Sequence, residues 1–115
     1  THECSSAASD VYKRQASKYI KFLLDLDIIK NDVSKMLASY NAGPGNFSKW
    51  SKNFYKTEID PIFMIETLPA RQTRNYIKLV LTNLWIYKIR LNEKPDLLFK
   101  LASGSIPKYE FKNDR

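Results

Sequence analysis

The longest uninterrupted pattern in this 115-residue chain is a helical one, and it runs from Arg71 to about Leu91. Its apolar residues recur at intervals of three and four, the spacing that places side chains on one face of an α-helix. They are Ile77, Val80, Leu81, Leu84 and Trp85, with Lys88 or Ile89 continuing the stripe. Asn92 and Pro95 follow and end the pattern. We therefore predict one long helix here, whose apolar stripe needs other segments to cover it.

Two helices are predicted before a glycine-rich turn. From Ala16 onward, apolar side chains again fall on one helix face; these are Tyr19, Ile20, Leu23 and Leu24. Asn31 or Asp32 can cap a second helix, in which Val33, Met36, Leu37 and Tyr40 share a face. The turn at residues 43–45, Gly-Pro-Gly, stops that helix, because glycine accepts left-handed backbone angles and proline cannot continue the hydrogen-bond ladder.

Three further helices are predicted after this turn. Asn46 can cap a short one that carries Phe47, Trp50 and Phe54. Asp60 followed by Pro61 is a strong start signal for another. Residues 96–102 can form a last helix, closed by Gly104. No segment shows convincing period-two alternation, so the predicted class is all-α, with about five to six helices.

The chain divides into three parts by composition. Residues 1–15 are small and polar without a clear period, and we predict a non-native or disordered head there. Residues 16–105 hold the helical patterns and form the predicted domain. Residues 106–115 are predicted to be a charged tail. No apolar run approaches the 18 residues of a membrane span.

Composition excludes several kinds of site. Cys4 is the only cysteine and His2 the only histidine, so an intramolecular disulfide, a cysteine zinc site and a histidine-dependent triad are not expected, and we predict no metal and no cofactor. The net charge of +7 favours polyanionic partners. A basic helical nucleic-acid binder is therefore one candidate class, but the lysines are scattered and no nucleic-acid motif is present, so we predict no nucleic-acid partner.

Two strings carry a resemblance. Residues 38–46 read ASYNAGPGN and are followed by Trp50; residues 60–77 read DPIFMIETLPARQTRNYI. They are similar to the A-x-Y-N-A-G-P-G-N…W and D-P-x-x-F-I-E-x-I-P-x-x-E-T-R-N-Y-V segments of the soluble (SLT) type of peptidoglycan lytic transglycosylase. The predicted helices on either side also resemble that family, so the match covers roughly residues 16–92 in the family's order.

The resemblance implies the C-terminal half of a goose-type lysozyme-like domain with a deep substrate groove. Enzymes of this family cut the MurNAc–GlcNAc bond of peptidoglycan without water and leave a 1,6-anhydro-MurNAc end. One glutamic acid acts as general acid and then as base, which requires a raised pKa. It belongs to an E-S motif that a G-L-M-Q motif follows, and neither occurs here. Glu3 precedes a cysteine and lies too close to Tyr40, so we predict that the chain lacks the catalytic residue and is inactive.

The resemblance also implies substrate-binding residues. They are Tyr40, Asn41, Ala42, Gly43, Gln72, Arg74 and Tyr76. From periodicity alone, Tyr40 would complete an apolar helix face; the family string favours a place in the groove beside the acid. Gln72 stands where the family usually has Glu, so it keeps an acceptor and loses the charge. For Tyr76, a place in the groove and a place in the core are about equally open.

Charged and aromatic residues near the second string have plainer interpretations. Glu66, Arg71 and Arg74 are expected to form a structural ion network, with recognition of stem-peptide carboxylates as the alternative. Phe47, Trp50, Phe54 and Trp85 are expected in the core. The partners implied by the family are peptidoglycan glycan strands, in the periplasm or cell envelope, with envelope association through a missing part of the protein. The alternative function is a non-catalytic peptidoglycan-binding or scaffolding module.

Overall fold

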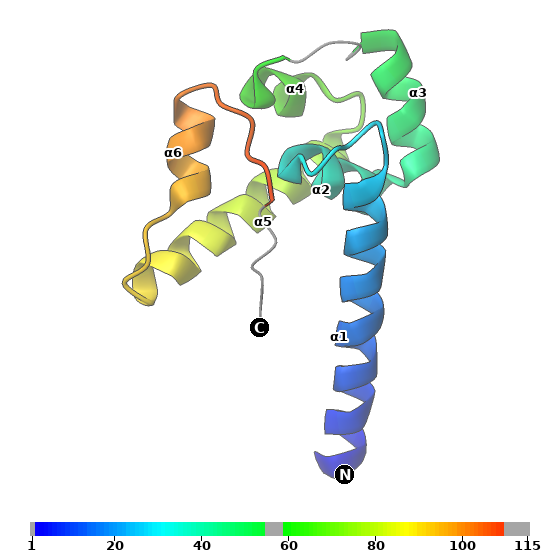
Figure 1. Cartoon of the computed structure of the whole chain (residues 1–115), viewed down its shortest axis with the longest axis vertical. Coiled ribbons are helices and arrows are strands. Elements are labelled where there is room, and N and C mark those ends of the chain that lie inside the picture. The colour runs from blue at the N-terminus through cyan, green and yellow to red at the C-terminus, as the bar shows by residue number, and fades with distance from the viewer. Residues whose placement is uncertain (1, 55–58, 110–115) are drawn as a thin grey trace.

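The structure, a computed structural model of the chain, describes residues 2–54 and 59–109, with side chains described for residues 8–52 and 59–109. Helices account for most of these residues (Figure 1). They are α1 (His2–Asp25), α2 (Val33–Ala42), α3 (Pro44–Phe54), α4 (Pro61–Thr67), α5 (Arg71–Arg90) and α6 (Asp96–Ala102). Within the described ranges there is no strand, only an isolated bridge. The predicted all-α class is confirmed.

Helix α2 lies at the centre of the fold. It packs against α1, α3 and α5, while α4 packs against α5. Six of its ten residues are buried: Val33, Ser34, Met36, Leu37, Ala38 and Ser39. The core around it draws on the other helices and the α1–α2 loop, through Leu23, Leu24, Ile29, Phe47, Met64, Ile65, Leu68, Ile77, Leu81 and Leu101. The short second helix of the sequence therefore organises the molecule, rather than the long α5.

Two of the predicted helix caps are present. The Asp32 carboxylate accepts the backbone N–H of Lys35 at 3.1 Å at the start of α2. The Asp60 carboxylate accepts those of Ile62 at 2.9 Å and Phe63 at 3.2 Å at the start of α4. Each bond satisfies a backbone donor that the first turn of a helix leaves without a partner.

Helix α1 begins at His2, well before the predicted start at Ala16. It extends away from the other helices and carries the N-terminus to its far end (Figure 1). The side chains of residues 8–15 are all exposed. The radius of gyration is 15.4 Å, against about 13 Å for a compact chain of this length. Our expectation of a disordered head is thus corrected for residues 2–15, whereas their non-native origin stays a prediction.

The segment after α6 returns to the α1–α2 loop. The Val33 N–H donates to the Pro107 carbonyl at 2.9 Å, and the Tyr109 N–H donates to the Asn31 carbonyl at 2.7 Å. Between these bonds, Asp32 and Lys108 form an antiparallel bridge. Residues 107–109, which we assigned to a charged tail, are therefore paired with the loop that precedes α2. Residues 110–115 of that predicted tail lie outside the described residues.

The predicted stripe of α5 is covered only along part of its length. Ile77 and Leu81 are buried, and Val80 and Trp85 are partly buried against the core. Near the C-terminal end, Ile89 is 57% exposed. Among the described residues, no helix is both long enough and apolar enough to cross a membrane.

Candidate functional site

The end of α2 and the first turn of α5 meet, and a hydrogen bond joins them. The Thr73 hydroxyl donates to Asn41 Oδ1 at 2.8 Å. Thr73 is only 2% exposed, so water does not compete for this contact. Asn41 belongs to the first string of the resemblance and Thr73 to the second. The fold thus brings the two strings side by side, although 32 positions separate the bonded residues.

Aromatic rings continue this junction at the surface. The Tyr40 and Tyr76 rings are nearly parallel, with centroids 6.5 Å apart and an interplanar angle of 6°. Tyr40 is 39% exposed and Tyr76 is half-buried. The Tyr40 ring also lies near the Tyr19 ring of α1, with centroids 5.7 Å apart and an interplanar angle of 52°, and the Tyr19 and Phe22 ring centroids are 6.2 Å apart. Four rings from three helices therefore form one continuous aromatic surface.

The turn after α2 keeps the backbone beside this surface open. Gly43 has φ of +93°, which a residue with a side chain rarely adopts, and a Cβ placed there would meet nothing within 4 Å. Ala42 and Gly43 are half-buried. Helix α3 begins at Pro44, so Asn46 is not the N-cap that we predicted. Its side-chain amide instead donates to the Ala42 carbonyl at 2.8 Å, which satisfies an acceptor at the end of α2.

Gln72 lies on the same side of α5 as Tyr76. Residues four apart on a helix are neighbours on its surface, and both belong to the first two turns of α5. Gln72 is exposed. Its amide is therefore available to a molecule that contacts the Tyr40–Tyr76 pair.

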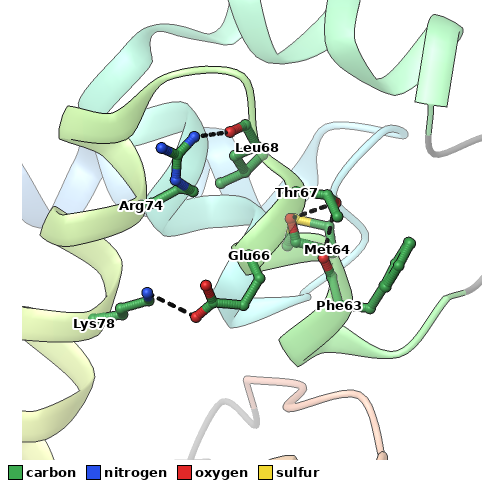
Figure 2. Close-up of polar contacts among 7 residues, drawn as sticks. All are labelled: Phe63, Met64, Glu66, Thr67, Leu68, Arg74 and Lys78. Carbon is green, nitrogen blue, oxygen red and sulfur yellow. Dashed lines mark hydrogen bonds and ion pairs between the residues drawn. The ribbon is translucent and has the colours of Figure 1, made fainter.

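Arg74 faces away from Tyr76 and serves the α4–α5 turn. Its Nη1 donates to the carbonyl of Leu68, the residue that ends α4 (Figure 2). The expected ion network of Glu66 with Arg71 and Arg74 is wrong in its pairing, because Glu66 pairs with Lys78 at 2.7 Å. Lys78 lies one helical turn after Arg74 on α5. Its side chain reaches Glu66 of α4, a contact that the sequence alone did not indicate. The structure thus groups the other predicted site residues at the α2–α5 junction and separates Arg74 from them.

Most of the aromatic residues assigned to the core are found there. Phe47 is fully buried, and Trp50 and Trp85 are partly buried against the core. The side chain of Phe54 lies outside the described residues.

A separate cavity of about 190 Å³ opens between α4, α5 and α6. Its lining includes Ile65, Leu81, Trp85 and Leu101, and none of the predicted site residues. The candidate site is therefore an open surface on another side of α5.

The site offers neutral hydrogen-bonding groups. Burial, and after it the neighbouring Tyr40, raise the pKa of Tyr76 above its usual value, so this phenol stays protonated at neutral pH. Phenols and amides can donate to and accept from sugar hydroxyls and acetamido groups. Exposed ring faces beside such groups are typical of sites that bind ligands with both apolar and polar surface.

Three acidic residues make contacts that stabilise the fold and do not lie at the Tyr40–Tyr76 surface. Asp60 caps α4 and Glu66 pairs with Lys78. Asp32 is buried, and burial raises its pKa, which is the property expected of a general acid. However, it caps α2 at the end opposite to Tyr40, about 12 Å away along the helix axis. Among the described residues, no group of His, Cys, Asp and Glu could hold a metal ion.

Sequence reasoning missed Thr73, Tyr19 and Phe22. Thr73 lies inside the second string, three residues before Tyr76, and this spacing on one helix face was the available signal. Tyr19 was assigned to the apolar face of the first helix, yet it is 38% exposed. Nothing in the local pattern of Phe22 distinguished it from other surface residues.

Comparisons with known proteins match part of the chain, and the family model covers the α2 side of the candidate site. Residues 13–63 match the family model described as transglycosylase SLT domain. The soluble lytic murein transglycosylase of Escherichia coli (strain K12) is 38% identical over 61 residues, and that of Salmonella typhimurium (strain LT2) is 36% identical over 61 residues. Each alignment covers 53% of this chain and 9% of the relative, so the chain spans about a tenth of the relatives' length. No solved structure gives a significant match.

Proposed function

From the premise that residues 13–63 match the model of the transglycosylase SLT domain, we propose that the α2–α5 junction is part of the wall of a peptidoglycan-binding groove. The parent activity is non-hydrolytic cleavage of the MurNAc–GlcNAc bond, which yields a 1,6-anhydro-MurNAc end. With this substrate we also propose a location in the periplasm or cell envelope, where peptidoglycan lies. The observation that carries this proposal is the meeting of the two family-like strings through Asn41 and Thr73.

Each residue at the junction has a role in this proposal. Tyr40 and Tyr76 provide ring faces for the apolar face of a sugar, and their hydroxyls bond its polar edge. The Asn41 amide bonds an acetamido group. Ala42 and Gly43 let the strand approach the backbone, because a Cβ at position 43 is missing and the space there is open. Gln72 contacts the same glycan strand from α5.

Arg74 has a supporting role instead. Its guanidinium holds the Leu68 carbonyl, so it fixes the start of α5 and thereby the place of Gln72 and Tyr76. We withdraw it from direct contact with the glycan.

The general acid of the reaction is proposed to come from a part of the parent protein outside these 115 residues. Asp32, Asp60 and Glu66 are engaged in caps and in an ion pair, and the chain contains no E-S motif followed by G-L-M-Q. A glycosidase-like reaction needs a proton donor at the scissile oxygen. The chain alone is therefore expected to bind glycan and to leave it uncut.

Binding and cleavage are tested separately. The 115-residue chain is titrated with a soluble tetrasaccharide of two GlcNAc–MurNAc repeats while its ¹H–¹⁵N spectrum is recorded. Tyr40→Ala should weaken binding about tenfold, since it removes a ring face and a hydroxyl. Tyr87→Ala, at an exposed position far along α5, is the control and should bind as the wild type does.

Cleavage is assayed by incubating the chain with purified sacculi and analysing the released fragments by mass spectrometry. We expect no 1,6-anhydro products. Their appearance would overturn the proposal that the acid lies elsewhere. Retention of the chain on heparin with no binding to sacculi or tetrasaccharide would instead overturn the glycan-binding proposal and favour a polyanion binder.

A further inference from the structure

Thr73 is buried, polar and bonded to a proposed binding residue. Its hydroxyl lies in the first turn of α5 and donates to Asn41 Oδ1 at 2.8 Å. A buried hydroxyl in a helix usually bonds a backbone carbonyl of its own helix. This one instead bonds a side chain on another helix.

In the structure the Thr73 hydroxyl donates, so the Asn41 amide turns its oxygen toward Thr73. An asparagine side chain has one acceptor, the oxygen, and two donor protons on the nitrogen. With the oxygen facing Thr73, the two protons of Nδ2 point away from Thr73. Asn41 is half-buried and directly follows Tyr40 in the chain, so its side chain is accessible next to the Tyr40–Tyr76 pair.

We propose that Thr73 is a positioning residue that holds the Asn41 amide with its donors toward the glycan, where they bond the carbonyl oxygen of an acetamido group. This inference rests on the proposed function. An amide fixed in its bound orientation loses less side-chain freedom when the ligand arrives. A free amide could rotate by half a turn and present its oxygen, which cannot donate to an acetamido oxygen.

A purely structural role for Thr73 makes a different prediction. If the bond only joins α2 to α5, its loss lowers stability and leaves the affinity of the folded protein unchanged. If it also orients the amide, its loss lowers the affinity through Asn41 alone. A double-mutant cycle separates the two roles.

The experiment uses the full chain and the GlcNAc–MurNAc tetrasaccharide, with affinity from ¹H–¹⁵N titration. Thr73→Val keeps the volume and removes the hydroxyl, and should weaken binding about five- to tenfold. Thr73→Ser restores the hydroxyl and should bind within about twofold of the wild type. Thr82→Val, an exposed threonine on the same helix, is the matched control and should also stay within about twofold.

Asn41 variants complete the cycle. Asn41→Asp keeps an oxygen for Thr73 and loses both donors, so it should bind as weakly as Asn41→Ala. In the Asn41→Ala background, Thr73→Val should add less than about a twofold loss. The Asn41 side-chain NH₂ resonances should move in Thr73→Val and return to their wild-type positions in Thr73→Ser.

The failures are distinguishable. A wild-type chain that binds no tetrasaccharide overturns both this inference and the proposed function. Wild-type affinity in Thr73→Val overturns the inference alone. A Thr73→Val loss that persists undiminished in the Asn41→Ala background also overturns it, because the effect would then bypass the amide.

Discussion

Helices α1 and α2 have similar apolar periodicity, but they differ in how much of each helix is buried. Six of the ten residues of α2 are buried, whereas among the described side chains of α1 only Leu23 and Leu24 are fully buried. Both lie in the last turns of α1, where α2 packs against it. Tyr19, which shares the predicted apolar face with them, is 38% exposed. Periodicity therefore tells which face of a helix is apolar, and only the neighbouring elements decide whether that face is covered.

The largest difference should come from truncating one side chain in each helix. Leu37→Ala in α2 removes a side chain from the centre of the core and should lower the free energy of unfolding by about 2–5 kcal/mol. Val11→Ala in α1 truncates a half-exposed side chain, so it should lower the free energy of unfolding much less. Chemical denaturation followed by circular dichroism measures both. Similar losses in the two variants would remove the contrast between the helices.

A smaller effect is expected from the cap of α2. Burial raises the pKa of Asp32 above its value of 3.8 in the unfolded chain. Its contribution to stability is therefore fully present below pH 3.8 and is lost as the pH rises through the raised pKa. Asn also caps helices well and carries no charge. Asp32→Asn should thus be more stable than the wild type at pH 7.

The pH dependence sharpens this prediction. The advantage of Asp32→Asn should shrink as the pH falls toward 3.8, because the wild-type carboxyl then becomes neutral in the folded state. Urea denaturation at a series of pH values measures it, with Asp60→Asn at the exposed cap of α4 as the control. An advantage that grows on acidification would show that Asp32 is stabilised in its charged form.

The smallest effect is expected far out on α1. Tyr12 is 71% exposed, and Ser has nearly the same helix propensity as Tyr. Tyr12→Ser should change the free energy of unfolding by less than about 0.5 kcal/mol. Thermal unfolding over a range of protein concentrations measures it. A loss above about 1 kcal/mol would mean that α1 packs against something in solution.

Local signals in the sequence predicted the elements that local chemistry determines. These elements are the Asp32 and Asp60 caps, the stop at Gly43 and the long helix from Arg71. Each depends on residues that are close to one another in the sequence. The start of α3 was misplaced by the same reasoning. Pro44 already fits the first helical turn, and the Asn46 amide has a better use at the Ala42 carbonyl.

What the sequence could not show depends on contacts between distant segments. Lys78, rather than Arg71 or Arg74, pairs with Glu66, and this choice depends on how α4 packs against α5. For the site, the family-like strings predicted Tyr40, Asn41, Gln72 and Tyr76, and the structure brings the Tyr40 and Tyr76 rings together; the binding roles of all four stay predictions. Thr73 and Tyr19 acquire their neighbours only when α1, α2 and α5 pack.

The pairing of residues 107–109 with the α1–α2 loop has a kinetic consequence. Its hydrogen bonds join the α1–α2 loop to the C-terminal end of the described chain, so closing this long loop carries an entropic cost before the bonds compensate for it. These contacts should therefore form late, after the helices have docked. Breaking them would chiefly hasten unfolding and leave the rate of folding almost unchanged.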